Sequence, residues 1–144
     1  MKRVVVCLPA RVALVDPDPE ETGRRDVELL DGWKDDATAV IGWSSGGWDA
    51  LELTALHADA IERLVLVATP RPDEDIDWLD GVSAKTLLLY GTADSATGSS
   101  HARWWQRRLA NARLEMNPGG GHDLLAPLWP RILSFVAPRT ARRD

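Results

Sequence analysis

The sequence is poor in cysteine, has no excess of positive charge and contains no long apolar run. Its 144 residues include one cysteine, Cys7, so no internal disulfide can form and a reducing, cytoplasmic location is expected. The net charge of -5 argues against binding to the phosphate backbone of nucleic acids. The first apolar run meets Pro9 and Arg11 too early for a signal peptide. No stretch reaches the roughly 20 apolar residues of a membrane helix, so we expect no membrane partner.

Aromatic residues other than tryptophan are also scarce, with one tyrosine and one phenylalanine against seven tryptophans. Trp43, Trp48 and Trp78 are the bulky candidates for the apolar rim of a substrate site, although simple filling of the core explains them equally well. Trp104 and Trp105 are adjacent, so they cannot both face the core from one helix. We therefore expect one of these two to be exposed or to meet a partner.

Short apolar runs, bounded by glycine, proline or aspartate, recur along the chain. They cover residues 4–8, 12–15, 38–43, 63–69, 86–91 and 113–117. Most are continuously apolar, which is typical of strands covered on both faces. Crossover helices are expected within residues 23–36, 46–62 and 99–112, and a final helix within residues 123–136. This alternation predicts an α/β three-layer sandwich, whose mostly parallel sheet of about five to six strands carries helices on both faces.

Three parts of the sequence limit this architecture. The runs at 4–8 and 12–15 are too close for a parallel crossover, so they form a hairpin, one bent strand, or a strand followed by an irregular segment. Residues 16–23 are loop-like in composition; Asp16 and Asp18 lack a third clustered ligand, so no metal site is expected. Residues 71–84 leave room for one short helix and no cap domain. We expect one domain over residues 1–138 and a flexible tail over 139–144.

A run of glycine and serine, GWSSGG, lies between an expected strand and an expected helix. A nucleophile elbow needs small residues two positions before and two positions after its serine, because the tight turn brings those backbones close together. Ser44 has Gly42 and Gly46 at these positions, whereas Ser45 has Trp43 two positions before it. Ser44 is therefore the candidate nucleophile, and a plain Gly/Ser turn is the alternative.

Three histidines could supply a base for such a serine. His57 falls in or at the end of a helix, and His101 lies near a possible N-cap serine, so both suit structural or surface roles. His122 follows NPGGG, a loop whose glycines allow close approach to another backbone, and it is the natural base. Asp94, at the carboxyl end of an expected strand, is the candidate acid, with a turn-forming role as the alternative. Asp123 is placed to cap the last helix.

The order Ser44, Asp94, His122 is the order of the α/β-hydrolase fold. The chain resembles that superfamily, especially its small cap-less serine hydrolases, over residues 36–137. The stretches that carry the resemblance are VIGWSSGGWDALELTALHADAIERLVLVATP, KTLLLYGTAD and NPGGGHDLLAPLWPRILSFV. The resemblance implies a serine esterase or thioesterase that acts on a small acyl substrate through an acyl-enzyme, without metal or organic cofactor.

The superfamily typically has a His-Gly-type turn after an early strand, where a backbone N–H completes the oxyanion hole. This chain has CLPAR there, and Pro9 has no N–H to donate. Ala10 or Arg11 is therefore expected to act beside the amide of Ser45. Two other functions stay open: a catalytically weak or inactive relative that acts as a binding or interaction module, and an acyltransferase.

Overall fold

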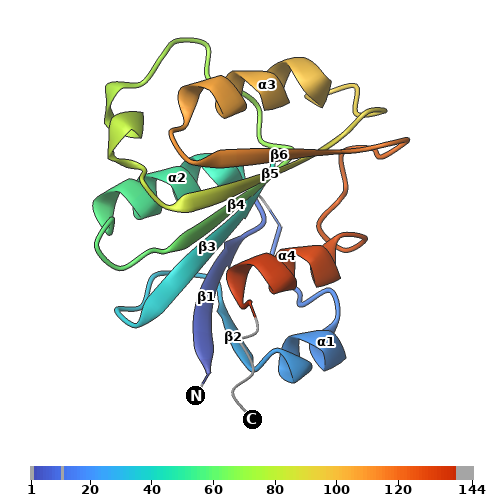
Figure 1. The fold of residues 1–144 in the computed structure, drawn as a ribbon. Helices are drawn as coiled ribbons and strands as arrows, with labels where there is room; N and C mark the ends of the chain where they lie inside the picture. The colour runs from blue at the N-terminus through green and yellow to red at the C-terminus, as the bar shows by residue number, and fades with distance from the viewer. Residues whose placement is uncertain (1, 11, 139–144) are drawn as a thin grey trace.

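Six parallel strands form one sheet in the computed structural model, which describes residues 2–10 and 12–138. The strands are β1 (Arg3–Leu8), β2 (Val27–Leu30), β3 (Ala37–Trp43), β4 (Arg63–Val67), β5 (Lys85–Gly91) and β6 (Ala112–Asn117). Their order across the sheet is β2-β1-β3-β4-β5-β6, and every neighbouring pair is parallel (Figure 1). The predicted parallel sheet is confirmed, and the expected tail at 139–144 lies outside the described residues.

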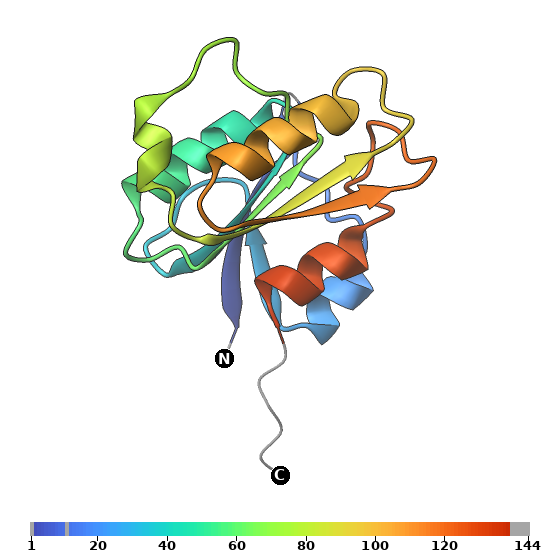
Figure 2. The same cartoon turned by 45° about the horizontal axis from the view of Figure 1, so that its top comes forward.

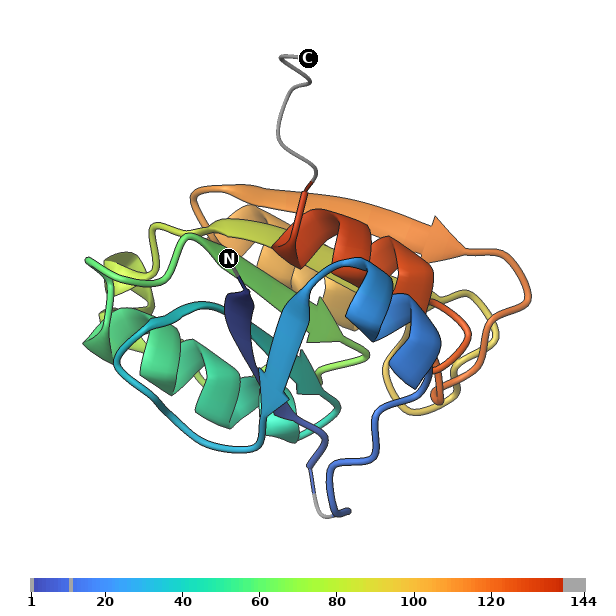
Figure 3. The same cartoon turned by 90° about the horizontal axis from the view of Figure 1, so that it is seen from below.

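Helices cover both faces of this sheet. The helices α2 (Gly46–Leu56) and α3 (Gly98–Arg108) lie on one face, with the short 3₁₀ helix η1 (Asp77–Gly81) beside them. On the other face, α1 (Pro19–Arg24) and α4 (Trp129–Val136) lie next to each other (Figure 3). The predicted three-layer sandwich is therefore confirmed. Within the described residues, no helix combines the length and apolar character that crossing a membrane requires.

The core has one apolar layer on each side of the sheet, because successive strand residues point to opposite faces. Val4 packs in the layer that holds Trp105 of α3, and Val5 packs in the layer that holds Trp129 of α4. Cys7 is fully buried, and burial, with a smaller effect from the charge of Asp16, raises its pKa to about 12. A thiol held protonated in this way contributes packing and no nucleophile.

The run at 12–15 is not a strand, so two of the three expectations for it were wrong. It forms an irregular segment after β1, in which Val12 and Val15 are 59% and 74% exposed. The reason is that both edges of β1 are already paired, with β2 and with β3. A further strand beside β1 would have no backbone partner.

The segment between β1 and β3 also differs from the expectation. The helix expected within residues 23–36 is absent and β2 occupies 27–30, whereas α1 takes up the second half of the expected loop at 16–23 and ends at Arg24. Pro19 opens α1, and the Asp18 side chain accepts a hydrogen bond from the Glu21 amide at 3.2 Å. A parallel crossover from β1 to β2 needs a connecting element, and this six-residue helix supplies it.

The last helix is shorter than its apolar pattern suggested. It begins at Trp129, after turns at residues 125–128, and its N-cap residue is Leu128. The expectation that Asp123 caps this helix was therefore wrong, because the helix starts well after that residue. Residues 71–84 hold only η1, as expected.

The direction of the connections fixes the place of the site. The chain leaves β1 toward α1 on one face and leaves β3 toward α2 on the other. Because the connections after β1 and β3 go to opposite faces of the sheet, a crevice forms at the carboxyl ends of these two neighbouring strands. Open α/β sheets bind ligands in such a crevice.

Candidate active site

Ser44 occupies the sharp turn between β3 and α2. Its backbone has φ of 55°, a left-handed conformation that is unfavourable for a residue with a side chain. Its amide donates to the carbonyl oxygen of Val67 at 2.7 Å, and its own carbonyl oxygen accepts from the amide of Gly47 at 3.0 Å. These two bonds hold the strained turn and project the hydroxyl from the carboxyl end of the sheet.

The glycines around Ser44 are required by backbone contacts. A Cβ atom on Gly42 would lie 2.5 Å from the Cα of Gly47. A Cβ atom on Gly46 would lie 2.1 Å from the carbonyl oxygen of Leu8 and 2.6 Å from the amide nitrogen of Ala10. These distances are far below van der Waals contact, so the turn can form only with glycine at both positions.

His122 lies beside this turn, in the loop that follows β6. Its Nε2 is 2.9 Å from Ser44 Oγ, and its Nδ1 is 2.8 Å from Oδ2 of Asp94. An ionised carboxylate only accepts hydrogen bonds, so Nδ1 carries the proton in this arrangement. Nε2 is then the acceptor for the Ser44 hydroxyl. The structure thus joins three residues that are far apart in sequence into one hydrogen-bonded chain.

Asp94 is held by its own turn as well as by His122. Its Oδ1 accepts from the amides of Ala96 at 2.8 Å and Thr97 at 3.3 Å, and its Oδ2 accepts from the Thr97 hydroxyl at 2.6 Å. The side chain is 1% exposed. Desolvation opposes its ionisation, but the hydrogen bonds from Thr97, His122 and Ala96 outweigh this and keep the pKa of Asp94 below its usual value.

Thr97 is a supporting residue that the sequence reasoning missed. Its hydroxyl fixes the carboxylate oxygen that faces the imidazole. The signal was present in the sequence, because a threonine three positions after an aspartate is typical of a turn in which the carboxylate accepts local hydrogen bonds. The turn-forming role of Asp94 and its contact with His122 therefore coexist in one side chain.

The loops after β5 and β6 lie side by side at the carboxyl end of the sheet (Figure 2). The amide of Ala93 donates to the carbonyl oxygen of Gly120 at 2.8 Å. A Cβ atom on Gly91 would lie 2.1 Å from that same oxygen, so the two backbones can approach only at a glycine. This close contact sets the distance between Asp94 and His122.

Two backbone amides lie near the start of α2, at the place expected for an oxyanion site. Ser45 is the N-cap residue of α2, and its side chain makes no capping hydrogen bond. Ala10 lies in the turn after β1 and has φ of 67°. The amide nitrogen of Ala10 packs against Gly46, in the first turn of α2, where a Cβ atom on the glycine would lie 2.6 Å from it. Arg11, the other candidate, lies outside the described residues.

Trp43 connects the turn at Ser44 to the loop that carries His122. Its indole Nε1–H donates to the backbone oxygen of His122 at 2.9 Å, and the two rings lie 5.3 Å apart between their centroids. Trp43 also lines a groove that includes Pro9 and Asp123. Trp48 packs edge-on against Trp105, and Trp78 is 40% exposed on η1.

The other histidines are engaged elsewhere. His57 ends α2 and stacks on Trp33, with ring centroids 3.6 Å apart. His101, on α3, accepts a hydrogen bond at Nδ1 from the amide of Arg71 at 2.9 Å. Across residues 2–10 and 12–138, no three acidic, histidine or cysteine side chains are grouped in a way that could hold a metal ion.

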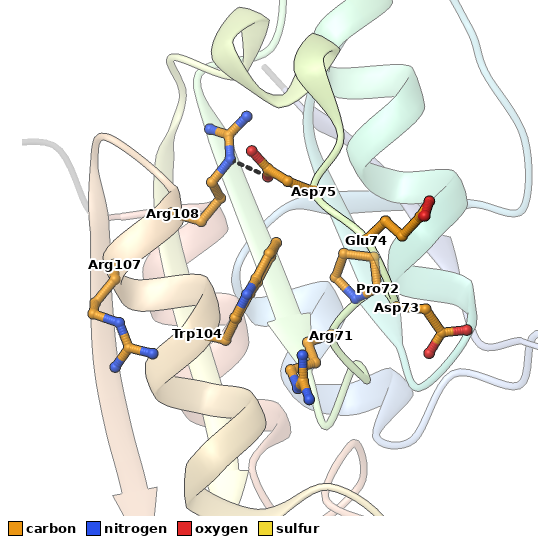
Figure 4. A pocket seen from close by; sticks show the side chains of 8 residues that line it. All are labelled: Arg71, Pro72, Asp73, Glu74, Asp75, Trp104, Arg107 and Arg108. Carbon is orange, nitrogen blue, oxygen red and sulfur yellow. Dashed lines mark hydrogen bonds and ion pairs between the residues drawn. The ribbon is translucent and has the colours of Figure 1, made fainter.

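A second cavity, of about 330 Å³, lies between α3 and the segment that follows β4. Figure 4 shows Trp104 between Arg71 and Arg108, with the Arg108 side chain reaching Asp75. The Nε–Oδ1 distance of that ion pair is 2.6 Å, and Arg108 also contacts Asp80 at 2.9 Å. None of the three residues of the hydrogen-bonded chain lines this cavity.

No protein-family model and no curated protein sequence matches this chain. Solved structures do match it. A predicted CIB-like hydrolase from Thermoplasma acidophilum has a TM-score of 0.76 at 14% identity, covering 94% of this chain and 86% of its own. MGS-MChE2, an alpha/beta hydrolase enzyme from the metagenome of sediments from the Mar Chica lagoon in Morocco, has a TM-score of 0.72 at 14% identity, covering 93% and 88%.

The thioesterase domain from the curacin biosynthetic pathway is also similar, with a TM-score of 0.74 at 11% identity, covering 94% of this chain and 90% of its own. At identities this low, structural likeness establishes the fold and leaves the activity to be argued from the site. The sheet order, the turn at Ser44 and these similarities agree. The chain has the α/β-hydrolase fold.

Proposed function

We propose that this protein is a serine hydrolase that cleaves a carboxylic ester or thioester through an acyl-enzyme. The observation that carries the proposal is the chain of hydrogen bonds from Ser44 Oγ through His122 to Asp94, at 2.9 and 2.8 Å. A serine held in a left-handed turn before a helix, with an imidazole in contact and a buried carboxylate behind it, is the arrangement that nucleophilic acyl transfer requires.

In the acylation half-reaction, Nε2 of His122 takes the proton of the Ser44 hydroxyl as Oγ attacks the carbonyl carbon of the substrate. The carbonyl oxygen becomes an oxyanion, which accepts hydrogen bonds from the backbone amides of Ser45 and Ala10. When the tetrahedral intermediate collapses, the alcohol or thiol leaves with the proton from His122. Asp94 stays ionised and holds the imidazolium in position throughout.

In the deacylation half-reaction, water attacks the acyl carbon and loses its proton to Nε2 of His122. Collapse of the second tetrahedral intermediate releases the carboxylic acid and returns the proton to Ser44. The dipole of α2 adds stabilisation, because its N-terminus points toward the developing negative charge. These steps need no metal or organic cofactor.

A fluorophosphonate probe tests this proposal. The native protein is expected to be labelled, and fragmentation of the labelled peptide by mass spectrometry should place the phosphonyl group on Ser44 and not on the adjacent Ser45. Ser44→Ala and His122→Ala should lose labelling. Ser100→Ala, an exposed serine on α3, is the matched control and should be labelled at the native rate.

A native protein that stays unlabelled while a control hydrolase reacts would overturn the enzymatic proposal and favour a binding or interaction module. Product analysis then separates hydrolysis from acyl transfer. In the presence of a small alcohol or amine acceptor, a hydrolase gives mainly the free acid, whereas an acyltransferase gives mainly the new ester or amide.

A further inference from the structure

A groove lies beside the proposed nucleophile, between the segment that follows β1 and the segment that follows β6. Its volume is about 410 Å³, within the roughly 300–1,000 Å³ that small-molecule sites occupy. Its wall includes Pro9, Trp43 and Asp123. In sequence these residues directly neighbour the proposed oxyanion donor, the proposed nucleophile and the proposed base, so the groove lies next to the proposed catalytic residues.

The wall of this groove is apolar and exposed. Four large hydrophobic side chains are exposed among the described residues, and two of them, Val12 and Val15, line the groove. The indole of Trp43 and the half-buried side chain of Leu125 continue the same surface. Because the run at 12–15 has no strand partner, its valines are left at the mouth of the site, where a ligand could remove them from water.

The charge of the groove is the second argument. Among the described residues that line it, Asp123 is the only ionisable one. A substrate carrying a carboxylate on its chain would therefore be repelled by Asp123 and would find no cationic partner in the described wall. The protein as a whole, at a net charge of -5, adds to this repulsion.

We propose that this groove binds the apolar chain of an uncharged ester or thioester, and that it discriminates against chains ending in a carboxylate. The proposal rests on the proposed hydrolase function and names its substrate class. The chain is an aliphatic or aryl group on one side of the scissile bond, and it packs between the valines of the 12–15 segment and the indole of Trp43.

Two ester series test the proposal and distinguish the two sides of the bond. The first is p-nitrophenyl acetate, butanoate and hexanoate, and the second is ethyl, butyl and hexyl acetate. In at least one series kcat/KM is expected to rise roughly twofold or more per added methylene. In the series that rises, a chain ending in a carboxylate is expected to react at least roughly tenfold more slowly with the enzyme than its neutral counterpart. The pair is mono-p-nitrophenyl succinate and the butanoate on the acyl side, or 3-carboxypropyl acetate and butyl acetate on the alcohol side. Flat responses in both series, or equal enzymatic cleavage of the charged and neutral chains in the series that rises, would overturn the proposal.

A pair of variants adds a matched control. Val15 and Leu56 are both 74% exposed, but only Val15 lines the groove. Val15→Asp should lower the ratio of kcat/KM for the longest ester to that for the acetate by roughly fivefold, whereas Leu56→Asp should keep the native ratio. Equal ratios for the two variants would contradict the assignment of the groove.

Binding measured without turnover separates this proposal from the proposed function. On the Ser44→Ala variant, titration with methyl hexanoate should shift the NMR signals of the Val12 and Val15 methyl groups and of the Trp43 indole N–H. Shifts without fluorophosphonate labelling of the native protein would support the groove and reject the hydrolase. Labelling without these shifts would support the hydrolase and reject the groove.

Discussion

The indole nitrogen of Trp43 donates a hydrogen bond to the backbone oxygen of His122, with an N–O distance of 2.9 Å. This bond joins the residue before the proposed nucleophile to the proposed base across 79 positions of sequence. The loop that carries His122 contains Gly119, Gly120 and Gly121 directly before the histidine, and glycines leave a backbone free to move. The hydrogen bond from the indole therefore restrains a loop whose glycine-rich sequence would not fix its conformation.

Trp43→Phe is expected to lower kcat while the KM for a short ester changes little. The variant keeps an aromatic ring but loses the N–H, and a hydrogen bond is worth about 0.5–1.5 kcal/mol, or roughly two- to tenfold in rate. Steady-state kinetics with p-nitrophenyl acetate measures this. Trp78→Phe, on the exposed surface of η1, is the control. A rise in KM at native kcat would assign Trp43 to substrate binding alone.

Asp94→Asn should change the pH dependence of stability in acid. The pKa of Asp94 is held below its usual 3.8, because its hydrogen bonds outweigh desolvation. A carboxyl group whose pKa is lower in the folded state stabilises the fold at pH values above its pKa in the unfolded chain. This stabilisation is lost as the pH falls through the pKa of the folded state. The native protein should exceed the variant by about 1–3 kcal/mol between pH 5 and 8, and the gap should shrink below pH ~4. Denaturant unfolding at several pH values measures the gap, and a constant gap would contradict the prediction.

Ser44→Gly should be more stable than Ser44→Ala, although both lose the hydroxyl. At φ of 55° a residue with a Cβ atom is strained, and relieving this is worth about 1 kcal/mol even after the greater freedom of unfolded glycine is counted. Ser99, in the first turn of α3, is the matched control. At position 99, denaturant unfolding should show the glycine variant to be less stable than the alanine variant. The same order at both positions would argue against strain at Ser44.

Replacing the amide of Ala10 with an ester tests its role as an oxyanion donor. Incorporating lactic acid at position 10 removes the N–H and keeps the methyl group. Loss of one oxyanion donor is expected to lower kcat by about 10²–10³. The same replacement at the exposed Ala58 should leave kcat within about twofold. Native kcat in the Ala10 ester would remove this amide from the mechanism.

Gly46→Ala is expected to destabilise the fold by about 1–3 kcal/mol or more, and to abolish fluorophosphonate labelling. The new methyl group would lie 2.1 Å from the Leu8 oxygen, and separating them moves the Ala10 amide away from the elbow. Gly23→Ala is the control, because nothing lies within 4 Å of its added methyl. That variant should be labelled normally and be more stable by up to about 1 kcal/mol.

Regular patterns and local motifs were readable from the sequence, because each depends on neighbouring residues alone. Short runs, most of them continuously apolar, predicted five of the six strands, and the spacing of Gly42, Ser44 and Gly46 predicted the turn that the structure shows. The N-terminal region was misread, since α1 has only six residues and β2 only four. Elements that short give almost no periodic signal.

The sequence by itself determined the α/β layering and the three residue types at the carboxyl ends of β3, β5 and β6, because strand and turn propensities act locally. Only the tertiary structure decided that the run at 12–15 borders a groove, since this depends on which edges of β1 are already paired. It also decided the distances from Ser44 to His122 and from His122 to Asp94. Those distances are set by contacts between segments far apart in sequence, namely Gly91 against Gly120 and Trp43 against His122.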